Sequence, residues 1–143
     1  MEVKFYDNVD DELLKFAVII SKSSGKWVFC KHKERDTYEV PGGHREANES
    51  IIDAARRELY EETGALTYSI TPISVYSVTE INQVNGKEEE TFGMLYYAQI
   101  ETFEKELHSE IEKIVFLDEQ PTELTYPLIQ PKLITKVMEI NSL

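Results

Sequence analysis

Three glutamates in residues 50–64 are the first candidates for chemistry, because their spacing places them together if the segment is helical. An α-helix turns by about 100° per residue, so Glu58, Glu61 and Glu62 share an arc of roughly 100°. Apolar residues fall within or beside the same arc: Ile51, Ala54, Ala55 and Leu59. The three carboxylates therefore lie on the side of the helix that should face a core.

Adjacent carboxylates that are partly buried are costly unless their pKa values rise or a positive charge neutralises them. Clustered carboxylate oxygens are hard ligands that suit Mg²⁺, with Mn²⁺ as the alternative. Gly42 and Gly43 precede the segment and allow close approach of the backbone, so a carbonyl there could add an oxygen ligand. Nearby arginines, or a solvated and purely structural acidic face, are the competing interpretations.

The elements that would position these acids can be predicted from local signals. Ser50 with Asp53 three residues later resembles a capping box, and Gly64 suits the left-handed residue that ends a helix. A last helix is expected to begin at Pro131. Its apolar face is expected to hold Leu133, Ile134, Val137 and Met138. Strands are expected at 16–21, 27–31, 37–40, 69–80, 91–100 and 113–117. Mixed strands and helices predict an α/β protein with helices packed against a mixed sheet.

Composition limits the function classes. The chain has 143 residues and a net charge of −12, which fits one domain over 1–143 and argues against an extended basic surface for nucleic acid. The longest apolar run, residues 16–20, is too short to span a bilayer, so no membrane partner is expected. The lone Cys30 permits no internal disulfide, is expected in the core, and favours a cytoplasmic location.

Residues 43–65 resemble the signature of the Nudix hydrolase family. The seven fixed glycine and charged positions of that signature are all present: Gly43, Glu49, Arg57, Glu58, Glu61, Glu62 and Gly64. Ala65 stands where a larger aliphatic residue is usual, and Asn48 where relatives often carry glycine. The resemblance implies a Nudix-like α/β/α sandwich with a mixed β-sheet and helices on both sides. It also implies metal-dependent hydrolysis of a nucleoside diphosphate linked to another group.

The resemblance assigns roles to residues at the matching positions. Glu61 and Glu62 resemble the main metal ligands, and Glu58 resembles a further ligand or the general base. The Gly42 carbonyl resembles another ligand, and Glu49 a supporting or additional metal group. Arg57 resembles the residue that orients the glutamates.

Family members often carry one more acid just before a late strand. Glu110 occupies such a place and is predicted to be an extra ligand or base, which makes it a catalytic candidate beside Glu58 and Arg57. A solvated loop acid is the alternative, and the acidic run 88–90 is a competing position. The general base is therefore left open among these acids.

The sequence identifies the residues that bind the substrate less clearly than the acidic residues. The candidates for phosphate contact are Lys31, Lys33, Arg35 and His44. The candidates for stacking on a base are Tyr38, Tyr76, Phe92 and Tyr126. His32 and His108 are expected at the surface, because no second histidine lies at zinc-binding spacing.

Small members of the family often act on nucleoside triphosphates, including oxidised ones, and release a monophosphate and pyrophosphate. Nucleotide sugars or dinucleoside polyphosphates are the alternative substrates. A non-catalytic nucleotide-binding module is the alternative from another class, although no glutamate of the signature is lost. The chain is expected to be a monomer or a homodimer.

Overall fold

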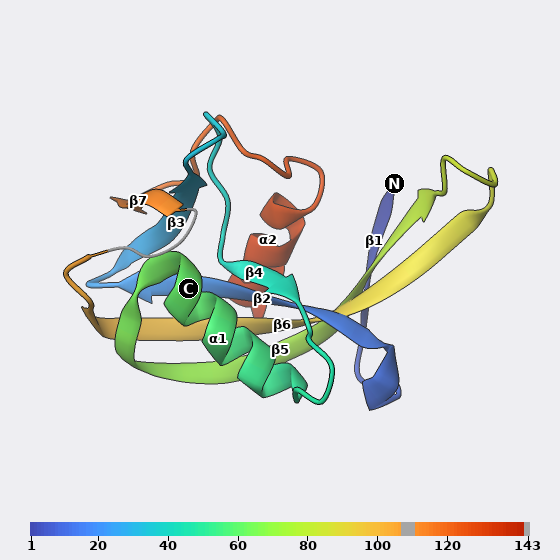
Figure 1. Ribbon diagram of the computed structural model, residues 1–143, viewed down its shortest axis with the longest axis horizontal. Coiled ribbons are helices and arrows are strands. Elements are labelled where there is room, and N and C mark those ends of the chain that lie inside the picture. Colours follow the sequence, from blue (N-terminus) through green and yellow to red (C-terminus); the bar gives the residue numbers. More distant parts are fainter. Residues whose placement is uncertain (107–110, 142–143) are drawn as a thin grey trace.

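The computed structural model describes residues 1–106 and 111–141, which form a seven-stranded mixed sheet with two α-helices (Figure 1). The strands are β1 (Glu2–Tyr6), β2 (Leu14–Ser23), β3 (Lys26–His32), β4 (Gly42–His44), β5 (Ala65–Ile81), β6 (Glu88–Phe103) and β7 (Ile111–Leu117). The helices are α1 (Ile51–Thr63), α2 (Gln130–Asn141) and a short 3₁₀ turn, η1 (Asp11–Leu13). The strand order is β1-β5-β6-β2-β3-β7, with β4 beside β2. The β2–β6 pair is parallel and the other pairs are antiparallel.

Two separate apolar clusters show that the helices cover opposite faces of the sheet. Successive strand residues point to opposite faces, so Ile19 of β2 joins one cluster and Ile20 joins the other. The first cluster contains the α1 residues Ala54, Ala55 and Leu59. The second contains the α2 residues Leu133, Ile134 and Val137. The predicted sandwich, with a mixed sheet and a helix on each side, is confirmed.

Helix α1 begins and ends at the predicted residues. The Ser50 hydroxyl accepts a hydrogen bond from the Asp53 amide at 3.2 Å, which satisfies a donor that a helix start leaves unpaired. Gly64 adopts φ 75°, a left-handed conformation that glycine reaches without a Cβ clash. Its amide donates to the Tyr60 carbonyl and closes the last turn.

The sheet opens beside β2, and this opening positions the candidate site. Strand β2 pairs with β3 only at Lys22 and Ser23, next to the hairpin turn. Further back, at residues 16–18, it pairs with β4 instead. Beyond the hairpin, strand β3 leaves β2 and pairs with β7 on its other side. Glu39 forms a bridge to β3 at Cys30. The C-terminal half of α1 therefore lies over a junction between β3, β4 and the segment that joins them.

Several sequence expectations need correction. Residues 37–40 make only isolated bridges, and the short strand follows Pro41 at Gly42–His44, where Gly42 pairs with Val18 of β2. Strand β1 was not predicted, and β5 and β6 extend several residues beyond their expected ends. Met138 is 38% exposed and does not join the buried face of α2. Cys30 is fully buried, as predicted.

Candidate functional site

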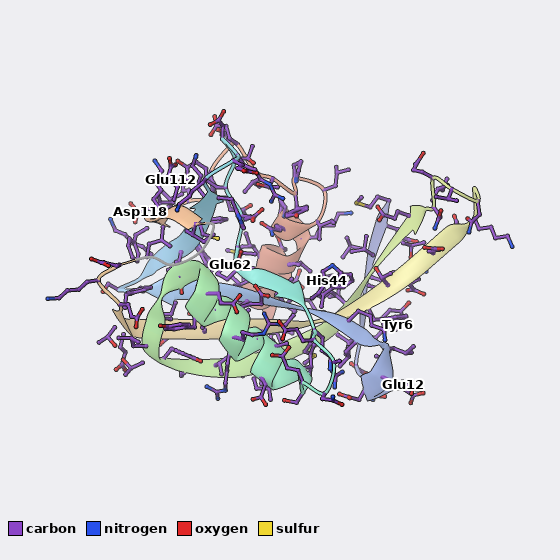
Figure 2. All side chains as sticks on the ribbon, viewed as in Figure 1. Tyr6, Glu12, His44, Glu62, Glu112 and Asp118 are labelled. Atoms are coloured by element: carbon purple, nitrogen blue, oxygen red, sulfur yellow. The ribbon has the colours of Figure 1, made fainter. Side chains whose placement is uncertain are left out.

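Glu62 lies at the centre of the site, in the last turn of α1 (Figure 2). Its side chain is nearly buried, and Oε1 accepts a hydrogen bond from the Gly42 amide at 2.7 Å. The pKa of Glu62 is raised to about 8, chiefly by burial and further by the neighbouring carboxylates of Glu58 and Glu39, against the lowering effect of the Gly42 amide. A cation would favour the charged form that burial opposes.

Glu58 lies one turn earlier on the same side of α1 and packs against the backbone of Gly43. A Cβ atom at Gly43 would overlap both oxygens and the carboxyl carbon of Glu58. Glycine is therefore required at position 43 for the carboxylate to reach β4. Burial raises the pKa of Glu58, while a hydrogen bond from Arg57 Nη1 at 2.8 Å lowers it.

Arg57 connects the helix to the loop that precedes it. Its Nε and Nη2 atoms donate to the two oxygens of Glu49 at 2.8 and 3.0 Å, and Nη2 also donates to the His44 carbonyl at 2.9 Å. The paired hydrogen bonds from Arg57 are the main reason that the pKa of Glu49 falls to about 2. The guanidinium thus fixes Glu49 and Glu58 relative to each other.

Glu61 completes the predicted group but differs in exposure. Its side chain is 47% exposed, and its carboxylate lies 3.6 Å from Arg57 Nη1. The structure therefore places Glu58, Glu62 and Glu61 on one side of α1 with unequal burial. Glu110 lies outside the described residues, as does His108. The competing acids 88–90 are exposed on β6, in the hairpin with β5.

Two further ligand-type side chains lie against Glu62 and were missed. His32 Nε2 is 3.0 Å from Glu62 Oε2 and 2.5 Å from Glu39 Oε1, so His32 is not the surface residue that was expected. Glu39 is 5% exposed. A signal for His32 was present, because strand alternation places it on the same face of β3 as Val28, which packs against α1. Glu39 lies next to β3 through its pairing with Cys30, nine residues earlier, which the residue pattern of 37–40 alone does not specify.

A pocket of about 300 Å³ borders this group of acids. Its lining includes Glu39, Gly42 and Gly43, which contact His32, Glu62 and Glu58 respectively. Its ring side chains are Phe16, His44, Tyr76 and Tyr126. The rings of His44 and Phe16 are in contact, with centroids 4.5 Å apart and planes tilted by 60°. Two of the four predicted stacking candidates, Tyr76 and Tyr126, therefore line the pocket.

Only one of the four residues predicted to contact phosphate lies at the pocket. His44 lines the pocket, whereas Lys31, Lys33 and Arg35 do not. Lys31 Nζ lies 2.6 Å from Glu112 on β7, and Arg35 Nη1 lies 3.0 Å from Glu39. Lys33 is exposed and forms no ion pair with a described residue. Phosphate binding by these three cations stays a prediction.

The site residues fit a divalent cation. The Glu62 and Glu58 carboxylates contact the adjacent residues Gly42 and Gly43, and the pKa of Glu62 is raised because its charge lacks solvation. Such a cation beside an aromatic pocket suits a planar group linked to phosphates.

Comparisons with known proteins identify relatives of this chain. The NUDIX domain model matches residues 12–133. The chain is 33% identical over 126 residues to YtkD of Bacillus subtilis, which bears the name of an 8-oxo-dGTP diphosphatase, with 87% of this chain and 75% of that protein covered. It is 29% identical over 119 residues to a protein of Lactococcus lactis subsp. cremoris named as a DHNTP pyrophosphohydrolase, with 81% and 70% covered. The crystal structure of a variant of the Bacillus subtilis pyrophosphohydrolase BsRppH superimposes with a TM-score of 0.76 at 28% identity, covering 96% of this chain and 90% of that one. Within the described residues, no helix is long and apolar enough to cross a membrane.

Proposed function

Because the chain belongs to the Nudix hydrolase family, whose members hydrolyse phosphoric anhydride bonds with a divalent metal, we propose that it is a Mg²⁺-dependent nucleoside triphosphate pyrophosphohydrolase. The substrate class includes oxidised triphosphates, and the products are a nucleoside monophosphate and pyrophosphate. One observation carries the proposal: the Glu62 and Glu58 carboxylates of α1 meet Gly42 and Gly43, which also line an aromatic pocket. The name of the YtkD relative specifies an oxidised triphosphate, which supports the same class.

The proposed cation ligands are the three α1 carboxylates, with the Gly42 carbonyl and Glu49 as further groups. A bound divalent cation would neutralise phosphate charge, orient the phosphates and lower the pKa of coordinated water. Glu62 is held toward that position by the Gly42 amide, and Glu58 by its packing against Gly43. Glu61 reaches the same side from a more exposed position.

Arg57 has a positioning role in this proposal. It fixes Glu49 by a two-point contact and Glu58 by a third hydrogen bond. The general base takes a proton from the attacking water, and Glu58, Glu110 or another acid can fill this role. Glu110→Gln separates them: it should lower turnover with a smaller effect on Mg²⁺ affinity if Glu110 is the base. Unchanged turnover would transfer the role to Glu58 or another acid.

The pocket is proposed to hold the base and sugar. The rings of Phe16 and Tyr126 offer stacking surfaces, and His44 lines the same pocket. Tyr76 also lines the pocket but is only 4% exposed. Phosphate contacts from Lys31 and Arg35 would require these cations to leave Glu112 and Glu39 or to act at longer range, and Lys33 would have to reach the phosphates from its exposed position.

A panel assay tests the proposed function. Purified protein loaded with Mg²⁺ is incubated with canonical and oxidised nucleoside triphosphates, nucleotide sugars and dinucleoside polyphosphates, and the released phosphate species are identified. Pyrophosphate release from a triphosphate is the expected result, with Glu62→Gln as the inactive control. Turnover only of sugar or dinucleoside substrates would replace the proposed substrate, and no turnover at all would favour a nucleotide-binding role.

We propose the remaining properties on narrower grounds. The net charge of −12 supports a small-molecule substrate over nucleic acid, and the lone buried Cys30 suits a cytoplasmic location. A single domain over 1–143 and a monomer or homodimer complete the proposal.

A further inference from the structure

Three ligand atoms converge at a point beside α1 that the Nudix signature does not describe. They belong to His32, Glu39 and Glu62, and all lie within 4.8 Å of one another. His32 Nε2 is 2.5 Å from Glu39 Oε1 and 3.0 Å from Glu62 Oε2. Both carboxylates are nearly buried, at 5% and 8% exposure. Of these three residues, only Glu62 belongs to the signature.

A single hydrogen on His32 Nε2 cannot serve both carboxylates at once. Nε2 is a single atom that carries at most one hydrogen, yet it faces two carboxylates. The Gly42 amide already donates to the other oxygen of Glu62, and Arg35, which contacts Glu39, is 46% exposed at its side chain. Two nearly buried carboxylates therefore share one ring nitrogen, and a cation between them would offset the charge of both.

The fold holds the three side chains on rigid elements. The Cys30 and Glu39 backbones exchange two hydrogen bonds, at 2.8 and 3.0 Å, which fix the segment containing Glu39 beside β3. His32 lies two residues beyond Cys30, on the face of β3 that α1 covers. Glu62 comes from the last turn of that helix. The convergence is thus determined by strand pairing and helix packing.

We propose that His32, Glu39 and Glu62 form a mixed nitrogen and oxygen metal site that prefers a first-row transition ion, such as Mn²⁺, over Mg²⁺. Imidazole nitrogen suits transition ions, whereas Mg²⁺ prefers oxygen ligands and retains its water. The inference rests on the proposed function in one respect, because Glu62 is shared with the carboxylates that would hold Mg²⁺. His32 and Glu39 extend that group toward β3 and alter which metal it retains.

Electron spin echo spectroscopy of Mn²⁺ tests the site directly, because it detects ¹⁴N nuclei bound to the ion. The full chain is stripped of metal, loaded with one equivalent of Mn²⁺, and compared with His32→Gln and Glu39→Gln. His44→Gln is the matched control for metal binding, since this exposed histidine contacts Phe16 through a tilted ring pair and is not one of the three converging residues. Circular dichroism and thermal melting establish that each variant is folded.

The wild type is expected to show ¹⁴N modulation that His32→Gln abolishes and His44→Gln retains. Calorimetric titration should show Mn²⁺ affinity at least about tenfold weaker in His32→Gln and Glu39→Gln, with Mg²⁺ affinity changed much less. Absence of ¹⁴N modulation in the wild type, or the same modulation in His32→Gln, would overturn the inference. If His32→Gln does not fold, Glu39→Gln and the wild-type spectrum decide the question.

The same samples separate this inference from the proposed function. Hydrolysis of triphosphates with Mg²⁺, without ¹⁴N modulation, rejects the mixed site and leaves the proposed activity in place. Histidine-dependent ¹⁴N modulation without hydrolysis of any nucleotide supports the metal site and rejects the proposed activity.

Discussion

Replacing Glu62 by Gln should make the metal-free protein more stable at high pH. The pKa of Glu62 rises from an ordinary value of 4.5 to about 8 in the folded chain, chiefly because the carboxylate loses solvation. Between these two values the folded protein holds a proton that the unfolded chain has released. The free energy of unfolding therefore falls as pH rises from 4.5 to 8 and stays low above that.

The size of this effect follows from the two pKa values. Each pKa unit corresponds to about 1.4 kcal/mol, so the loss of stability across the window is at most about 5 kcal/mol. Glutamine has nearly the same shape and does not titrate, and its side-chain oxygen can still accept the Gly42 amide hydrogen bond. Glu62→Gln should match the wild type at pH 4.5 and exceed it by several kcal/mol at pH 9.

Urea denaturation in EDTA at half-unit steps from pH 4.5 to 9 measures both curves. Glu61→Gln is the matched control, because Glu61 directly precedes Glu62 on the same helix and its side chain is 47% exposed. The control should follow the wild-type curve. Parallel curves for wild type and Glu62→Gln would refute the reasoning, since they would show that Glu62 does not bind a proton in this range. In a second experiment without EDTA, added Mg²⁺ should raise the stability of the wild type at pH 9 and leave that of Glu62→Gln nearly unchanged.

Three further substitutions test the parts that position the site. Gly43→Ala forces the Glu58 carboxylate away from β4 and should lower turnover by about 100-fold while the far-ultraviolet circular dichroism is unchanged; near-normal turnover would show that Glu58 can move without cost. Arg57→Lys removes the two-point contact that lowers the pKa of Glu49 to about 2, so it should destabilise the protein at pH 7. That deficit should shrink as pH falls from 4.5 toward 2, and a deficit independent of pH in denaturation curves would contradict the contact's role. Ser50→Ala removes the helix cap and should cost about 1 kcal/mol in urea denaturation, whereas no measurable loss would show that the cap contributes little.

The helix that carries the acids was predictable because its signals are local. Ser50, Gly64 and the apolar spacing between them specify the start, end and inward face within a single segment. The spacing argument also placed Glu58 and Glu62 on the apolar side, where the structure finds both of them largely buried. Local propensity and tertiary packing agree over this stretch.

The residues that were missed depend on contacts between distant segments. Strand β1 (Glu2–Tyr6) exists through pairing with residues 75–79 of β5, and five residues alone give too short a pattern to identify an edge strand. A strand was expected at 37–40, before Pro41, but the short strand follows Pro41 because residues 42–44 pair with β2. Glu39 and His32 become neighbours of Glu62 only when β3, its bridging segment and α1 meet.

The C-terminal end of helix α1 carries acidic residues where the helix dipole favours basic ones, and this unfavourable charge placement points to a function. The C-terminus of a helix carries partial negative charge, which favours basic residues there, yet the last turn of α1 has none and holds Glu61 and Glu62 instead. Arg57 forms ion pairs with Glu49, Glu58 and Glu61, so its charge is shared among carboxylates other than Glu62. The largest loss of solvation in this turn is therefore that of the nearly buried Glu62, whose pKa is raised to about 8. A sequence selected for stability alone would replace such a residue, and a bound cation is the simplest agent that turns the same arrangement into a favourable one.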